Sequence, residues 1–195
     1  MVNVFSADFH FGHHNIIKLC NRPHDSSIEF MDDIITKWNA VVPEDAIAYL
    51  LGDIAFSRKW LTKLNELKFK ELYIAIGNHD SSKDLMSWAR ECDRKVVIGS
   101  GFYVQLCHGE KKRLVYCTHR PINAVNNKPT ICGHVHDRYK TLAAGNVIHD
   151  KRKPERGNMV LNAPIINVGV DSWDFKPVFE KQLLEELQQL DAVFR

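Results

Sequence analysis

The stretch VNVFSADFH (residues 2–10) sets the pattern on which the fold prediction rests. Its apolar run from Val2 to Ala7 has the length of a buried strand, and it stops at two polar residues, Asp8 and His10. The apolar runs 46–51 and 72–76 stop in the same way, each at a glycine that is followed by polar residues. We therefore predict three buried strands, each of which delivers polar side chains at its carboxyl end.

Helical periodicity fills the gaps between these strands. Ser26 and Glu29 resemble a capping box, and apolar residues follow at helical spacing: Ile28, Met31, Ile34, Ile35 and Trp38. A second helix is predicted from Ser57 through Leu67, and these residues are expected to face inward: Trp60, Leu61, Leu64 and Leu67. A third helix is predicted from Ser81 or Ser82 to Cys92. The resulting β-α-β-α-β-α order predicts parallel strands with crossover helices.

The second half of the chain is richer in strands. The predicted strands are 96–98, 102–107, 113–118, 129–132, 159–161 and 165–168, and Pro177 opens a last amphipathic helix. The chain of 195 residues is long enough for one domain with a substantial core, so residues 1–195 are predicted to form a single domain. Two packed sheets flanked by helices account for both halves. Few residues are left over for a cap that would select a substrate.

Composition excludes several classes of protein. The net charge is only +2, which gives no sign of a nucleic-acid or membrane partner. The five cysteines are odd in number and form no CxxC pair, which argues against a disulfide framework and for a reducing cytosol. No apolar stretch approaches the ~20 residues that span a bilayer. The first residues lack the basic region of a signal peptide. A cytoplasmic location is therefore expected.

Polar motifs at the strand ends carry the chemistry. In open α/β sheets active sites lie beyond the carboxyl ends of the strands, and side chains two apart on an extended segment face the same way. The candidate metal ligands are Asp8, His10, Asp53, Asn78, His119, His134 and His136. Carboxylate, imidazole and amide oxygen suit borderline divalent ions. Seven ligands exceed the needs of one ion and fit two ions that share a bridging carboxylate.

In this order the motifs resemble the calcineurin-like metallophosphoesterase superfamily. They are Asp8-x-His10, Gly52-Asp53, Gly77-Asn78-His79-Asp80, His119 and Gly133-His134-x-His136, with NVGVD (167–171) as a further element. The stretch FGHHNII (11–17) is similar to a small bacterial and phage branch of that superfamily. The resemblance implies a four-layer α/β/β/α sandwich of two mixed sheets flanked by helices.

The resemblance also implies roles for single residues. One ion would be bound by Asp8, His10 and His136, and the other by Asn78, His119 and His134, with Asp53 as the bridge. A metal-bridging hydroxide would be the nucleophile. His79 would protonate the leaving oxygen or stabilise its charge, and Asp80 would orient His79. The two ions would be divalent, with Mn²⁺ as the first choice and Fe²⁺, Zn²⁺, Ni²⁺ or Co²⁺ as alternatives.

Residues around the metal ligands have two readings each. His13, His14 and Asn15 either touch a phosphate oxygen or are plain loop residues. Arg120 has donors that suit a phosphate, or it forms a salt bridge with a loop carboxylate. Asp171 is expected to be a cap or turn residue. The basic run 151–156 either receives a polyanion or, as we favour, is a solvated loop.

The expected function is hydrolysis of a phosphate ester, with a phosphodiester as the first choice. A phosphomonoesterase or nucleotide pyrophosphatase would use the same site. A catalytically silent metal-binding scaffold is the alternative from another class, and it usually lacks some ligands that are all present here. The expected partner is a small phosphoester. Nucleic acid is not indicated, a membrane is not expected, and the oligomeric state is left open.

Overall fold

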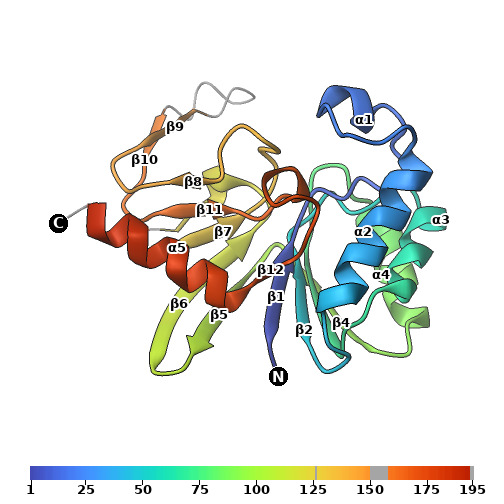
Figure 1. The fold of residues 1–195 in the computed structure, drawn as a ribbon, viewed down its shortest axis with the longest axis horizontal. Helices are drawn as coiled ribbons and strands as arrows, with labels where there is room; N and C mark the ends of the chain where they lie inside the picture. The colour runs from blue at the N-terminus through green and yellow to red at the C-terminus, as the bar shows by residue number, and fades with distance from the viewer. Residues whose placement is uncertain (126, 150–157, 194–195) are drawn as a thin grey trace.

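The computed structural model describes the chain except residues 126, 150–157 and 194–195 (Figure 1). The basic run 151–156 therefore lies outside the described residues. Within them the chain forms two five-stranded sheets, a separate two-stranded ribbon and the helices that flank the sheets. No helix in the described ranges has both the length and the apolar composition needed to cross a membrane.

The first sheet contains the three strands predicted from the first half of the chain. Its strand order is β12 (Val178–Phe179), β1 (Asn3–Ser6), β2 (Ile47–Leu50), β3 (Glu71–Ala75) and β4 (Lys95–Gly99). Strands β1 to β4 are parallel, and β12 pairs antiparallel with β1. The β-α-β-α-β-α prediction is confirmed, and the predicted strand 96–98 extends the parallel set by one more crossover.

The helix α2 (Ser27–Val41) begins where the capping box predicts. The Ser26 hydroxyl accepts a hydrogen bond from the Glu29 amide at 3.1 Å, which satisfies one of the free donors of the first turn. Met31, Ile34 and Trp38 are buried against the first sheet, as predicted. The prediction for Ile28 is wrong, because that side chain is 55% exposed and Phe30 takes the buried position.

The prediction of one continuous helix over 57–67 is also wrong. The segment is a short helix, α3 (Arg58–Leu61), followed by a 3₁₀ helix, η1 (Thr62–Glu66). Leu61, Leu64 and Leu67 are buried as predicted. Their spacing of three residues matches the three residues per turn of a 3₁₀ helix, so the tighter winding keeps all three on one face. The next helix, α4 (Ser82–Glu91), is capped by Ser81.

The second sheet is mixed and ends in short strands. Its order is β5 (Gly101–His108), β6 (Lys111–Thr118), β7 (Thr130–Cys132), β11 (Ile165–Asn167) and β8 (Thr141–Leu142). β6, β7 and β11 are mutually parallel neighbours, while β5 and β8 pair antiparallel at the two edges. The predicted strand 159–161 instead pairs in the ribbon formed by β9 (Val147–His149) and β10 (Asn158–Val160).

The core between the sheets joins the two halves of the chain. Phe5 and Tyr49 of the first sheet pack in one cluster with Val115 and Ile131 of the second. The last helix, α5 (Glu180–Val193), adds its buried leucines to the same cluster: Leu183, Leu184 and Leu187. Helices α2 to α4 cover the opposite face of the first sheet (Figure 1). The predicted α/β sandwich of two mixed sheets flanked by helices is confirmed.

Candidate metal centre

The loops that leave five strands bring the predicted ligands together. Asp8 and His10 follow β1, Asp53 follows β2 and Asn78 follows β3. His119 follows β6 of the second sheet. His134 and His136 follow β7. The two sheets therefore meet at their carboxyl ends around one group of carboxylate, amide and imidazole side chains.

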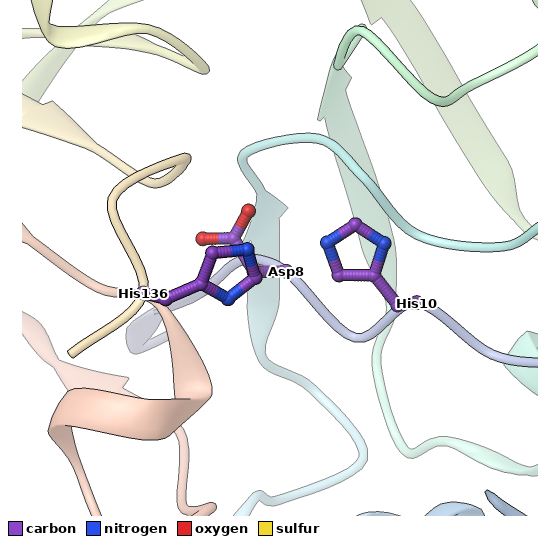
Figure 2. A group of neighbouring side chains, drawn as sticks. All are labelled: Asp8, His10 and His136. Atoms are coloured by element: carbon purple, nitrogen blue, oxygen red, sulfur yellow. The ribbon is translucent and has the colours of Figure 1, made fainter. Parts of the chain in front are cut away.

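The ligand atoms fall into two groups. In the first group, one atom each of Asp8, His10 and His136 lies within 4.8 Å of the others, and Figure 2 shows these three side chains sharing one space. The second group consists of Asp53, His119 and His134, by the same criterion. The first group has the composition predicted for one ion. The second group contains Asp53, the predicted bridge, and two predicted ligands of the other ion, His119 and His134.

Asp53 lies between the two groups. Its Oδ2 is 3.6 Å from His10 Nε2 and 3.3 Å from His119 Nε2. Burial by itself would raise the pKa of Asp53, but the hydrogen bond and charge of His119 hold it well below the usual range, so the carboxylate is ionised. An ionised oxygen that faces a histidine of each group has the position that a bridging ligand needs.

The contacts of His119 fit a bound cation. Its Nδ1 lies 2.8 Å from the carbonyl oxygen of Leu51, which can only accept, so Nδ1 carries the hydrogen. In the neutral ring Nε2 is then an acceptor, yet it faces Asp53 Oδ2 and also Asn78 Oδ1 at 3.1 Å. Three acceptors that face one another need a cation or an extra proton between them.

His10 provides a second sign that the residues fit a metal ion. It is buried, and within the described part of the chain neither ring nitrogen has a hydrogen-bond partner. Buried polar groups are nearly always paired, so this pair of orphaned nitrogens needs an explanation. Burial lowers the pKa of His10 to about 3, which keeps the ring neutral and leaves a nitrogen lone pair available for a metal ion.

The backbone of the ligand residues is unusual. Five of the candidate ligands have left-handed φ angles between 51° and 75°, namely Asp8, His10, Asp53, His134 and His136. Each such residue costs about 1–3 kcal/mol, and this kind of strain is concentrated at functional sites. The prediction that the paired ligands lie on extended strands is wrong, because β1 ends at Ser6 and β7 ends at Cys132. The side chains converge because the chain turns at each ligand.

Glycines allow the loops to approach the carboxylates. A Cβ atom added at Gly77 would lie 2.2 Å from Asp53 Oδ1, and one added at Gly133 would lie 2.7 Å from Asp8 Oδ2. The close approach at Gly133 accompanies a hydrogen bond of 2.8 Å from the His134 amide to Asp8 Oδ2. The Gly-Asn-His and Gly-His-x-His motifs therefore need glycine because no side chain fits between these loops and the carboxylates.

A buried ion pair supports His136, and its arginine could not be predicted from the sequence. The Arg22 guanidinium is fully buried and binds both oxygens of Asp171, at 2.7 and 2.9 Å. It also donates to the carbonyl oxygens of Asp8 and Phe9. Asp171 Oδ2 in turn lies 2.8 Å from His136 Nδ1. Asp171 lies inside the 3₁₀ helix η4 (Val170–Ser172) and not at a cap, and its carboxylate fixes the ring of a candidate ligand so that Nε2 is left for a metal ion.

We expect Asp171→Asn to weaken metal binding without unfolding the protein. The amide keeps the shape of the side chain but loses the charge that holds both Arg22 and the His136 ring. Loss of such an outer partner typically costs about 10–100-fold in metal affinity. The measurement is calorimetric titration with Mn²⁺. Asp174→Asn, the same chemical change at an exposed residue of the same loop, is the matched control. Equal affinities in the two variants would show that Asp171 has no such role.

His79 lies at the exposed side of the centre. Its amide donates to Asp53 Oδ1 at 2.8 Å, and its ring stacks on Phe56 and lies 5.4 Å from the ring of His10. The prediction that Asp80 orients the His79 ring is wrong. The Asp80 carboxylate instead accepts hydrogen bonds from the amides of Asp53, Ile54 and Gly77, so it holds the two ligand-bearing loops together.

The residues predicted to bind substrate differ in how close they lie to the ligand groups. His14 is exposed, and its Nδ1 bonds the Ser27 hydroxyl at 2.7 Å, away from the ligand groups. Asn15 is the N-cap residue of the short helix α1 (Ile16–Leu19), without a side-chain capping bond. His13 lies closer to the centre, with its ring 5.9 Å from that of His10.

Arg120 lines a cavity with His134, and it forms no ion pair with a carboxylate of the described residues. The salt-bridge reading of Arg120 therefore finds no support in the described part of the chain. Binding of substrate by this side chain stays a prediction.

Fold and side chains together define an α/β sandwich protein with a centre of histidines and carboxylates that could hold metal ions. No protein-family model matches the chain. The chain is 31% identical over 175 residues to the uncharacterized protein MJ1445 of Methanocaldococcus jannaschii, which covers 88% of this chain and 83% of that protein. It therefore belongs to the same family as the archaeal protein.

One solved structure shares the fold over nearly the whole chain. The crystal structure of the protein of unknown function AQ665 from Aquifex aeolicus matches with a TM-score of 0.63 and 21% identity, over 95% of this chain and 98% of that one. The phosphopantetheinyl hydrolase of Mycobacterium tuberculosis matches with a TM-score of only 0.30 and 16% identity, over 60% of this chain and 41% of that one. The first match shows a shared fold, and the second is too weak to bear on function.

Proposed function

We propose that this protein is a phosphoesterase that depends on two divalent metal ions, of the calcineurin-like type. The observation that carries the proposal is the position of Asp53, whose ionised Oδ2 lies 3.6 Å from a histidine of one ligand group and 3.3 Å from a histidine of the other. A carboxylate in that position suits a pair of ions better than a single one. Two ions at about 3.5–4 Å would supply the positive charge that an in-line phosphoryl displacement needs on its attacking and leaving oxygens.

The ligand chemistry supports borderline ions. The two groups contain imidazole nitrogens and carboxylate oxygens, and Asn78 adds an amide oxygen. This mixture suits Mn²⁺, Fe²⁺, Zn²⁺, Ni²⁺ or Co²⁺ better than Ca²⁺ or Mg²⁺, which prefer oxygen alone. Mn²⁺ is our first choice because it tolerates the largest share of oxygen ligands in this set.

We propose a phosphodiester as the preferred substrate. A monoester carries one more negative charge, and binding it well requires a cationic donor for its third free oxygen. The cationic side chain that we assign to that oxygen is Arg120, which follows the candidate ligand His119 in the chain. A monoester would therefore depend on this single arginine. A diester needs less charge compensation, but the departure of its alkoxide or aryloxide needs a proton or strong stabilisation. The exposed ring of His79, which lies beside His10, is available to protonate the leaving oxygen.

A substrate screen tests the proposal. The purified protein would be loaded in turn with each of the five candidate ions and assayed against a phosphomonoester, a phosphodiester and a nucleotide pyrophosphate. We expect hydrolysis that disappears after chelation with EDTA and returns on addition of Mn²⁺. Stoichiometric binding of two ions without turnover on any of the three classes would favour a silent scaffold and would overturn the proposal.

A further inference from the structure

A cavity of about 450 Å³ opens beside the second ligand group. Small-molecule sites typically measure about 300–1,000 Å³, so its size suits an organic group of a substrate. His134 lines the cavity and is also a member of the group that contains Asp53 and His119. A phosphate held at the ligand groups would therefore have this cavity within reach of one of its ester oxygens.

The walls of the cavity are mostly apolar. Ile122 comes from the short η2 helix (Pro121–Asn123), Leu142 comes from β8, and Val147 and Ile148 come from β9. Val147 is 45% exposed although it is apolar. The half-buried Tyr139 adds an aromatic face. Binding of a flat apolar group to such walls is favourable, because it removes apolar surface from water.

Two arginines line the same cavity. Neither Arg120 nor Arg138 has a side-chain hydrogen bond or ion pair with any residue that the structure describes. His149, by contrast, is fixed by a hydrogen bond of 2.6 Å to Asn158 across the ribbon. Arg120 follows the candidate ligand His119 in the chain, so it suits the reacting phosphate. Arg138 follows His134 and His136 in the chain and is exposed. No phosphate is assigned to it, so it is available for a second anion.

Part of the outer wall comes from a segment that the sequence did not predict. β8 and β9 are short strands without a clear alternating pattern, and few residues were expected to be left over for a cap. In the structure Leu142, Val147 and Ile148 line the cavity. A wall of apolar side chains, with charge confined to the arginines, selects on the organic part of a substrate.

A second cavity of similar size does not have this character. It lies between the β5–β6 hairpin and α5, with a volume of about 440 Å³. Two of its three basic residues already have partners, since Arg113 pairs with Asp191 and Lys111 bonds Gln188. It is lined by none of the candidate metal ligands.

We propose that the cavity beside His134 binds the ester group of the substrate, and that this group is a flat apolar ring that carries a second negative charge. The ring would occupy the space between Ile122, Leu142 and Ile148, and Arg138 would pair with its anion. This inference rests on the proposed phosphoesterase function and names the substrate class of that site. It predicts that selectivity is set by the cavity, while the metal ligands set the reaction.

The test uses three p-nitrophenyl phosphodiesters whose second ester group is methyl, phenyl or 4-carboxyphenyl. All three release the same leaving group, so differences in kcat/KM report the fit of the second group. In the Mn²⁺-loaded wild type we expect phenyl to exceed methyl by ~10-fold or more, the scale on which apolar pockets discriminate. The added carboxylate should contribute a further ~2–5-fold, as for an exposed ion pair.

Two variants separate the parts of the cavity. Leu142→Ala should remove most of the advantage of phenyl over methyl, and Leu114→Ala, on the exposed side of β6, is its control. Arg138→Gln should abolish the advantage of carboxyphenyl over phenyl, with Arg90→Gln on the exposed side of α4 as its control. Equal kcat/KM for the three diesters in the wild type, or ratios that neither variant alters, would overturn the inference and leave the phosphoesterase proposal intact.

A binding measurement tests the cavity without turnover. Ligand-observed NMR on the EDTA-treated protein would compare 4-carboxyphenyl phosphate with methyl phosphate, in the wild type and in Leu142→Ala. We expect the aryl compound to bind more tightly, and the variant to lose that difference. If no diester is hydrolysed, the proposed preference for diesters fails, and this comparison alone decides whether the cavity takes an anionic ring.

Discussion

Asp53→Asn should eliminate turnover and reduce the metal content of the protein. In the wild type Oδ1 accepts the His79 amide, and the ionised Oδ2 faces His10 and His119. An asparagine that keeps the first bond must turn its amide NH₂ toward the two imidazoles. The NH₂ group would then donate to the lone pairs that a cation needs, and the charge between the two groups would be lost. The site would keep the carboxylate of Asp8 but would lose the negative charge that faces both groups, so it would attract cations less.

The loss should be at least as large as that of one preorganised electrostatic group in a catalytic site, about 10²–10³-fold in kcat. Metal content would be measured by inductively coupled plasma mass spectrometry, and kcat on bis-p-nitrophenyl phosphate with Mn²⁺. Asp45→Asn makes the same chemical change at an exposed residue before β2 and should behave as the wild type. If Asp53→Asn retained two ions and full activity, Asp53 could not be a bridge.

The candidate centre could be predicted from the sequence because its signals are local. Each ligand follows a strand, most of these strands are short and apolar, and parallel strands place their carboxyl ends at one edge of a sheet. Asp8 and Asp53 were therefore expected to be neighbours although a helix separates them in the chain. The start of α2 was predictable for the same reason, since Ser26 and Glu29 form a motif within a single turn.

The supporting residues could not be predicted because their partners are distant in the chain. Arg22 and Asp171 are 149 positions apart, and nothing around Arg22 marks it as buried. The role of Asp80 was misjudged because its nearest neighbour in sequence is His79, whereas its carboxylate accepts from the backbone of Asp53 and Ile54. In both cases a buried charge is satisfied by groups from another loop, and only the folded structure determines which loop that is.

The short strands of the second half escaped prediction for a different reason. β8 has two residues and β9 has three, so neither shows the alternation that identifies a strand. They exist because β11 and β10 offer them backbone partners, with Ile165 opposite Leu142 and Ile148 opposite Met159. These unpredicted strands supply part of the apolar wall of the cavity beside His134, so the cavity itself could not be predicted from the sequence.

His79→Ala should damage the hydrolysis of alkyl diesters far more than that of p-nitrophenyl diesters. Protonation of a leaving oxygen by a well-placed acid is typically worth about 10²–10⁴-fold, but p-nitrophenolate is a weak base and leaves without a proton. The exposed His79 ring, stacked on Phe56, lies at the edge of the centre, which is the position that our proposal requires of the proton donor. The loss in kcat/KM should therefore grow as the leaving group becomes more basic.

The measurement is kcat/KM for bis-p-nitrophenyl phosphate, p-nitrophenyl phosphate and an alkyl diester, in wild type, His79→Ala and the control His108→Ala at the exposed β5–β6 hairpin. A wild type that is clearly faster on the monoester would refute the preference for diesters. A loss in His79→Ala that is uniform across leaving groups would have another meaning. Because alanine keeps the backbone amide that donates to Asp53, a uniform loss would assign the His79 ring to stabilising charge at the centre, and the proton of the leaving alcohol would have to come from water.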